Sequence, residues 1–118
     1  MGAPGQRKNG QPNIPSVTVR EAQARLAEPE SDAVLIDVRE VWEYVEVRAQ
    51  GAKNIPLSEL IRRVGEIPHE KDVLLICHTG QRSLSAAAYL QRQGIARVFN
   101  VDGGTEEWEQ AGLPVEHG

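Results

Sequence analysis

Short, largely apolar runs that alternate with segments of helical spacing constrain the fold of this chain more than any other feature. Such runs occur at residues 34–36, 73–77 and 98–101, and their length suits strands that are covered on both faces. Residues 82–93 have the pattern of a helix that ends at Gly94. The alternation predicts an α/β fold with a central, mainly parallel sheet of about five strands and helices on both faces.

Weaker patterns predict the remaining elements. Brief strands are expected at residues 16–18 and 51–56, and short helices at residues 19–27 and 40–45. Residues 57–64 place apolar side chains at helical spacing and predict a further amphipathic helix. Thr105, which follows a Gly-Gly pair, is the expected N-cap of a last helix that extends to Ala111.

The length and charge of the chain limit the classes of protein it can be. The 118 residues predict one domain at 16–118, preceded by a flexible tail at 1–15 that is rich in Gly, Pro, Gln and Asn. The formal net charge of −4 argues against a nucleic-acid partner. No apolar run approaches the roughly 20 residues that span a bilayer, and the first residues lack the apolar core of a secretory signal. We therefore expect a cytoplasmic protein without a membrane partner.

Cys77 is the only cysteine of the chain and the main candidate for its chemistry. It ends the run at 73–77, and a short glycine-containing loop leads from it into the predicted helix. Backbone N–H groups and the dipole at such a helix N-terminus favour the thiolate over the thiol. A lone cysteine offers no internal disulfide, no cluster of thiolate ligands for zinc and no Cys-x-x-Cys redox pair. We expect neither a metal site nor a cofactor.

Three motifs, in order along the chain, resemble those of a known family. The first is Leu-Ile-Asp-Val-Arg-Glu at 35–40, with Trp-Glu-Tyr at 42–44 and Gly-Ala-Lys-Asn-Ile-Pro at 51–56. The second is Cys-His-Thr-Gly-Gln-Arg-Ser at 77–83, and the third is Val-Asp-Gly-Gly at 101–104 with Trp108 and Gly-Leu-Pro at 112–114. Over residues 16–116 the chain resembles single-domain rhodaneses, which are thiosulfate or persulfide sulfurtransferases. Residues 47–50 depart from the family's Gly-His-Ile-Pro pattern, which leaves the conformation of that connection open.

The resemblance implies a chemistry for the second motif. The Cys77 thiolate would attack the outer sulfur of thiosulfate or a persulfide donor, carry it as a persulfide, and pass it to a thiol or cyanide in a ping-pong cycle. The expected substrate-binding residues are His78, Thr79, Gly80, Gln81, Arg82 and Ser83. The amides of residues 79–83 would hold the anionic sulfur, and Arg82 would bind an oxyanion. His78 is also a candidate for acid–base work, although such a loop residue often only faces solvent.

Structural interpretations of the same residues remain open at this point. Cys77 can be an inert buried hydrophobe, and Arg82 can pair with a carboxylate such as Asp37. Asp37 and Arg39 are expected to support the site rather than to act in catalysis. In this role Asp37 is an acidic group at a strand end, and Arg39 is a partner for Glu43 or for a neighbouring loop.

Two other functions compete with sulfur transfer by an enzyme. Cysteine phosphatases place five residues between their cysteine and arginine, whereas Cys77 and Arg82 are separated by four, and this tighter ring suits a sulfur atom better than a phosphate. A non-enzymatic relay or interaction module on the same fold would dock a partner, with Cys77 only passing sulfur along. In either kind of sulfur transfer the acceptor thiol belongs to another molecule, which can be a protein, because the chain has no second cysteine.

Overall fold

A computed structural model of the chain describes residues 13–118; residues 1–12, which make up most of the expected tail, lie outside the described residues. Within residues 13–118, five parallel strands form a central sheet in the order β1-β6-β5-β2-β4. Their bounds are Ser16–Val17 (β1), Val34–Asp37 (β2), Lys53–Asn54 (β4), Val73–Ile76 (β5) and Val98–Val101 (β6). The predicted α/β architecture is confirmed, and β5, which leads to Cys77, is the central strand.

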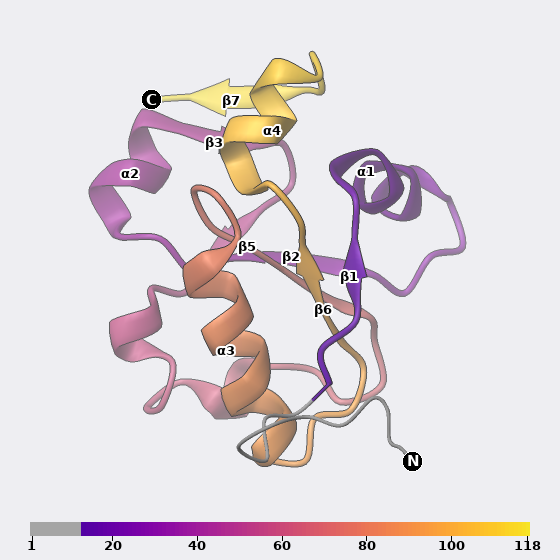
Figure 1. Cartoon of the computed structure of the whole chain (residues 1–118), viewed down its shortest axis with the longest axis vertical. Coiled ribbons are helices and arrows are strands. Elements are labelled where there is room, and N and C mark those ends of the chain that lie inside the picture. Colours follow the sequence, from indigo (N-terminus) through magenta and orange to yellow (C-terminus); the bar gives the residue numbers. More distant parts are fainter. Residues whose placement is uncertain (1–12) are drawn as a thin grey trace, which may run out of the picture.

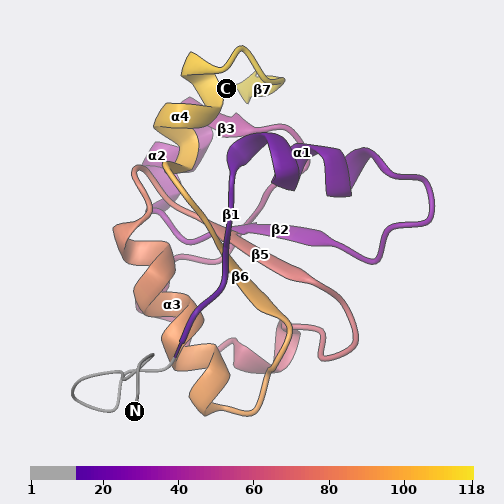
Figure 2. The ribbon, with the colours of Figure 1, turned by 45° about the vertical axis from the view of Figure 1, so that its right-hand side comes forward.

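Helices cover both faces of this sheet (Figures 1 and 2). Their bounds are Val19–Ala27 (α1), Val41–Glu46 (α2), Gln81–Arg92 (α3) and Gly104–Gln110 (α4). Among residues 13–118, none of the helices has both the length and the apolarity needed to cross a bilayer.

The core is divided by the sheet into two apolar clusters. On one face Leu35 and Leu74 pack with Trp108 of α4, and on the other Leu75 packs with Leu90 of α3. Neighbouring residues of β5 thus enter opposite clusters, as the alternation of side chains along a strand requires. Because the strands are buried on both faces, their residues are apolar at successive positions in the sequence.

Local hydrogen bonds explain why α1 begins where it does. Thr18 Oγ1 accepts from the backbone N–H of Glu21 at 3.0 Å, and Glu21 Oε1 accepts from the N–H of Thr18 at 2.8 Å. This capping box satisfies two backbone donors at the helix start. The start of α1 after β1 is therefore encoded by two residues three positions apart.

The segment that departs from the family pattern forms part of a second, smaller sheet. Val47–Ala49 (β3) pairs in antiparallel register with Val115–His117 (β7), so that Val47 lies opposite His117. The pair lies beside α2 and α4 (Figure 1). The connection left open by the sequence is thus an ordered strand, which follows α2 directly and joins it to the end of the described chain.

The prediction of an amphipathic helix at residues 57–64 is wrong. The structure has two short 3₁₀ turns instead, Leu57–Glu59 (η2) and Val64–Glu66 (η3). Leu60 is buried but Ile61 is 71% exposed, so the four apolar residues do not form one buried face. Arg63 leaves helical geometry at φ −109°, and Gly65 and Pro68 disfavour helix beyond it.

Thr105 is not the N-cap of the last helix, contrary to the sequence prediction. Gly103 takes that position with φ +80°, and α4 begins one residue before Thr105. The left-handed conformation favours glycine at the cap. Thr105 lies buried in the first turn, and its Oγ1 has no hydrogen-bond partner among residues 13–118.

Candidate active site

Cys77 lies at the carboxyl end of β5, which is where ligands bind in open parallel sheets. Residues 78–80 turn the chain from this strand into α3. Gly80 is the N-cap of α3 with φ +109°, a conformation that a residue with a side chain rarely adopts. The turn brings the N-terminus of α3 back over the Cys77 side chain, which is 1% exposed.

Three groups of the loop contact the sulfur of Cys77. The backbone N–H groups of Gly80 and Ser83 donate to Sγ at 3.1 and 3.3 Å, and Ser83 Oγ lies 3.3 Å from it. Of the five amides predicted to face the sulfur, those of Gly80 and Ser83 make these short hydrogen bonds within the described residues. The Thr79 amide acts on the sulfur more weakly, as the smallest of the effects that lower its pKa. The thiol is therefore held by a smaller set of donors than the sequence suggested.

Opposing effects set the pKa of the Cys77 thiol. Burial raises the pKa, whereas hydrogen bonds from the Ser83 hydroxyl and from the amides of Ser83, Gly80 and Thr79 lower it. The net result is a pKa below that of an ordinary cysteine. More of the thiolate, the nucleophilic form, is then present near neutral pH.

Asn100 is a buried polar residue of β6 that the sequence pattern alone marked only as part of a strand. Its Oδ1 accepts from Ser83 Oγ at 2.6 Å. Since a hydroxyl has one hydrogen to donate, the Cys77 thiol is the donor to Ser83 while that hydrogen points to Asn100. When the hydrogen turns to Sγ, it stabilises the thiolate. An asparagine inside an apolar run was the sequence signal that could have revealed this contact.

The first turn of α4 is hydrogen-bonded to the backbone of the Cys77 loop. The N–H groups of Thr105 and Glu106 donate to the carbonyl oxygens of Cys77 and His78 at 2.8 and 3.0 Å. A Cβ at Gly104 would lie 2.5 Å from the Cys77 carbonyl oxygen, so only glycine allows this approach. Gly104 thus allows the first turn of α4 to come close enough to bind these two carbonyl groups.

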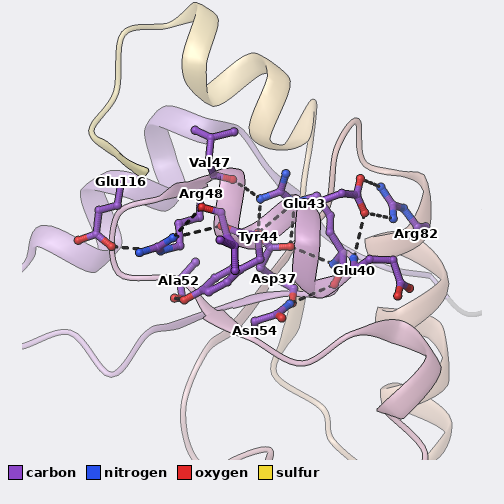
Figure 3. A network of polar contacts seen from close by, with 12 residues as sticks. Asp37, Glu40, Glu43, Tyr44, Val47, Arg48, Ala52, Asn54, Arg82 and Glu116 are labelled. Carbon is purple, nitrogen blue, oxygen red and sulfur yellow. Dashed lines mark hydrogen bonds and ion pairs between the residues drawn. The ribbon is translucent and has the colours of Figure 1, made fainter. Parts of the chain in front are cut away.

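Arg82 is paired with Glu43 of α2, a partner that the sequence did not indicate (Figure 3). Its Nη1 and Nη2 donate to Oε1 and Oε2 of Glu43 at 2.8 and 2.9 Å. This hydrogen bond is the main reason that the pKa of Glu43 falls to about 2, with burial opposing it. The alternative prediction, that Arg82 pairs with a carboxylate, therefore holds, but Asp37 as its example is wrong, because Asp37 binds Arg39 instead.

Asp37 and Arg39 form a buried pair beneath the site. Nε and Nη2 of Arg39 contact the Asp37 carboxylate, the shortest distance being 2.8 Å, and Nη2 also donates to the Val47 carbonyl at 2.6 Å. Of the two partners predicted for Arg39, the neighbouring segment is the one bonded, and Glu43 is not. Through the Val47 carbonyl the pair links the end of β2 to β3, and Figure 3 labels Asp37 and Val47 at the two ends of this link.

The remaining loop residues face outward. His78, Thr79 and Gln81 are exposed. Within residues 13–118, no three His, Cys, Asp or Glu side chains lie together in a group that could hold a metal ion. The chemistry that this arrangement offers is that of an activated thiol beside a helix N-terminus.

Comparison with known proteins agrees with this architecture. The family model described as a rhodanese-like domain matches residues 18–111. A sulfurtransferase of Allochromatium vinosum is 40% identical over 91 residues, which are 77% of this chain and 84% of that protein. The thiosulfate sulfurtransferase GlpE of Vibrio cholerae is 32% identical over 100 residues, which are 85% of this chain and 92% of that protein.

A solved structure is similar in fold as well. A rhodanese-related protein of Thermoplasma volcanium has a TM-score of 0.79 and 27% identity, and the match covers 87% of this chain and 98% of that one. The family model spans most of the chain, from the capping box of α1 to the end of α4. The chain belongs to the rhodanese-like family.

Proposed function

We propose that this chain is a sulfurtransferase in which Cys77 carries sulfur as a persulfide. The observation that carries the proposal is the contact of Sγ with two amides and a hydroxyl at the N-terminus of α3. These donors stabilise an anionic sulfur without a metal ligand or a second thiol. Relatives named as sulfurtransferases support the same chemistry.

The first half-reaction transfers the outer sulfur of a donor to Cys77. The thiolate attacks that sulfur, a new S–S bond forms, and the S–S bond of thiosulfate breaks, with its electron pair leaving on sulfite. Cys77 then carries a persulfide whose terminal sulfur is anionic. Backbone N–H groups at the N-terminus of α3 are suited to bind that charge, because they point at the site and need no reorganisation.

The second half-reaction returns the enzyme to its starting state. A thiolate or cyanide attacks the terminal sulfur, the S–S bond of the persulfide breaks, and the electron pair returns to Cys77. The product is a new persulfide or thiocyanate. Because each half-reaction releases a product before the next substrate binds, ping-pong kinetics are expected.

Mass spectrometry of the intact protein tests the proposal directly. After treatment with thiosulfate or a persulfide donor, the wild type should gain the mass of one sulfur atom, and Cys77→Ser should not. Serine keeps the size of the side chain but lacks the sulfur nucleophile. An unmodified wild type after exposure to both donors would refute the proposal.

A relay that passes sulfur to a protein is the second candidate, and an exposed apolar surface on α2 favours it. Val41, Trp42 and Val45 are 54, 69 and 46% exposed, on the helix that also carries Glu43. Such a surface beside the loop is suited to contact a protein acceptor. The rate at which cyanide removes sulfur from the preformed Cys77 persulfide separates the two candidates, since a relay would release its sulfur slowly without its partner.

A further inference from the structure

Glu43 occupies the part of Arg82 that would otherwise bind the oxygens of a sulfur donor. Both terminal nitrogens of the guanidinium donate to the two carboxylate oxygens of Glu43, at 2.8 and 2.9 Å. This is the bidentate geometry in which arginine also recognises oxyanions. A donor that needs the same two N–H groups must therefore compete with a carboxylate already in place.

The carboxylate of Glu43 is held firmly in this position. Its Oε1 also accepts from the backbone N–H of Glu40 at 3.0 Å, which closes the capping box of α2. The side chain is only 16% exposed, whereas that of Arg82 is 37% exposed. The chain continues directly from α2 into β3, which is paired with β7. The pair is thus part of the scaffold around the loop and not a loose surface contact.

The pairing removes the net positive charge of the loop. Arg82 is the only Lys or Arg between residues 77 and 83. Arg82 directly precedes Ser83, whose N–H donates to Cys77 Sγ at 3.3 Å, so the guanidinium belongs to the same turn of α3 as the sulfur contact. The pKa of Arg82 is raised, mainly by its hydrogen bond to Glu43. With Glu43 beside it, an incoming anion meets a cation and an anion together, and the attraction largely cancels.

We propose that Glu43 is a specificity-determining residue, which directs the Cys77 site away from the thiosulfate dianion and toward donors with at most one negative charge on the reacting group. Hydropersulfides are the natural class of such donors. This inference rests on the proposed function and deepens it. Arg82 then has a structural role in its ion pair with Glu43 as well as a role toward the substrate. The amides at the N-terminus of α3 stabilise the transferred sulfur.

Two small donors differ in charge but react in the same way. Thiosulfate is a dianion and releases sulfite, and methanethiosulfonate is a monoanion and releases methanesulfinate. In both, the Cys77 thiolate bonds to the outer sulfur, the S–S bond of the donor breaks, and the electron pair leaves with the sulfur–oxygen group. The ratio of their kcat/KM values therefore reports the effect of one donor charge on the same step.

The test replaces Glu43 by glutamine and measures kcat/KM for both donors with cyanide as acceptor. Glu43→Gln keeps an oxygen for the capping box but removes the charge. Because a Coulombic effect scales with donor charge, kcat/KM should rise about tenfold for thiosulfate and about threefold for methanethiosulfonate. At high salt both gains should shrink.

Glu46→Gln is the matched control, since it removes the same charge from an exposed position of the same helix. It should leave the ratio of the two donors unchanged. Equal gains for both donors in Glu43→Gln, no gain, or the same change in Glu46→Gln would overturn the inference. The proposed function would still stand in these cases if the Cys77 persulfide forms; failure of thiosulfate and of a persulfide donor to form it in the wild type would overturn both.

A second variant keeps the inference testable if Glu43→Gln is unstable. Arg82→Gln leaves the carboxylate of Glu43 without its cation, so anionic donors should be repelled. We expect kcat/KM to fall about tenfold for thiosulfate and about threefold for methanethiosulfonate. A loss that is the same for both donors would contradict the role of the pair in selecting donor charge.

Discussion

Two arginine–carboxylate pairs lie close together in this protein and differ mainly in burial. The side chains of Arg39 and Asp37 are 4 and 0% exposed, whereas those of Arg82 and Glu43 are 37 and 16% exposed. The first pair has every charge enclosed by protein, and the second opens to solvent at the loop. The same chemical contact therefore supports the fold in one place and adjusts the electrostatics of a site in the other.

The largest expected difference between the pairs is in stability. Arg39→Met should lower the free energy of unfolding by about 3–5 kcal/mol, because it leaves the buried carboxylate of Asp37 without a partner. Arg82→Met, with the same change of side chain in the more exposed pair, should cost about 1 kcal/mol or less. Urea unfolding followed by circular dichroism measures both values. Similar losses in the two variants would remove the distinction drawn from burial.

A smaller effect is expected on the reactivity of Cys77, and it separates hydrogen bonding from charge at the site. Ser83→Ala should slow alkylation of Cys77 by iodoacetamide at neutral pH about tenfold, since the thiolate loses a hydrogen-bond donor. Ser83→Thr keeps the hydroxyl and serves as the control. Arg82→Met should slow the reaction less than Ser83→Ala, because Glu43 already offsets the charge of Arg82. The opposite order would show that the cation, and not the hydroxyl, dominates the thiolate.

The smallest expected effect is on the stability of the protein at low pH. The pKa of Glu43 is lowered from 4.5 to about 2, so its pair with Arg82 stabilises the protein above the ordinary pKa and loses this contribution as the pH falls toward 2. Between a pH of about 5 and a pH of about 2, the wild type should therefore lose on the order of 1 kcal/mol more stability than Glu43→Gln loses. Thermal melts of the wild type and of Glu43→Gln across this pH range, with Glu46→Gln as control, measure the difference. Parallel curves for all three would show that the exposed pair adds nothing to stability.

The central sheet could be predicted from the sequence because its strands are covered on both faces. Runs such as residues 73–77 are continuously apolar, and this pattern survives without knowledge of the partners. The helix at Val19–Ala27 was also located, since Thr18 and Glu21 encode its start locally. The two 3₁₀ turns at 57–66 could not be predicted, because the helical spacing of four apolar residues does not reveal which of them the tertiary structure buries.

The candidate site was only partly visible for a related reason. The position of Cys77 before a glycine-containing loop is a local pattern, and the structure places it as expected at the end of β5. The partners of the loop are not local: Glu43 lies 39 positions from Arg82, and Asn100 lies 17 positions from Ser83. Such contacts depend on how strands and helices are arranged in space, so a single sequence does not reveal them.

The contact between α4 and the Cys77 loop has a consequence for the order in which the protein matures. Thr105 and Glu106 hold the carbonyl groups of Cys77 and His78, and Asn100 holds Ser83, yet all three of these residues are synthesised after the loop itself. A ribosome-bound chain that has just exposed Cys77 therefore lacks the groups that fix its geometry. The thiol is expected to acquire the geometry described for the folded site only when the segment through α4 has emerged and docked.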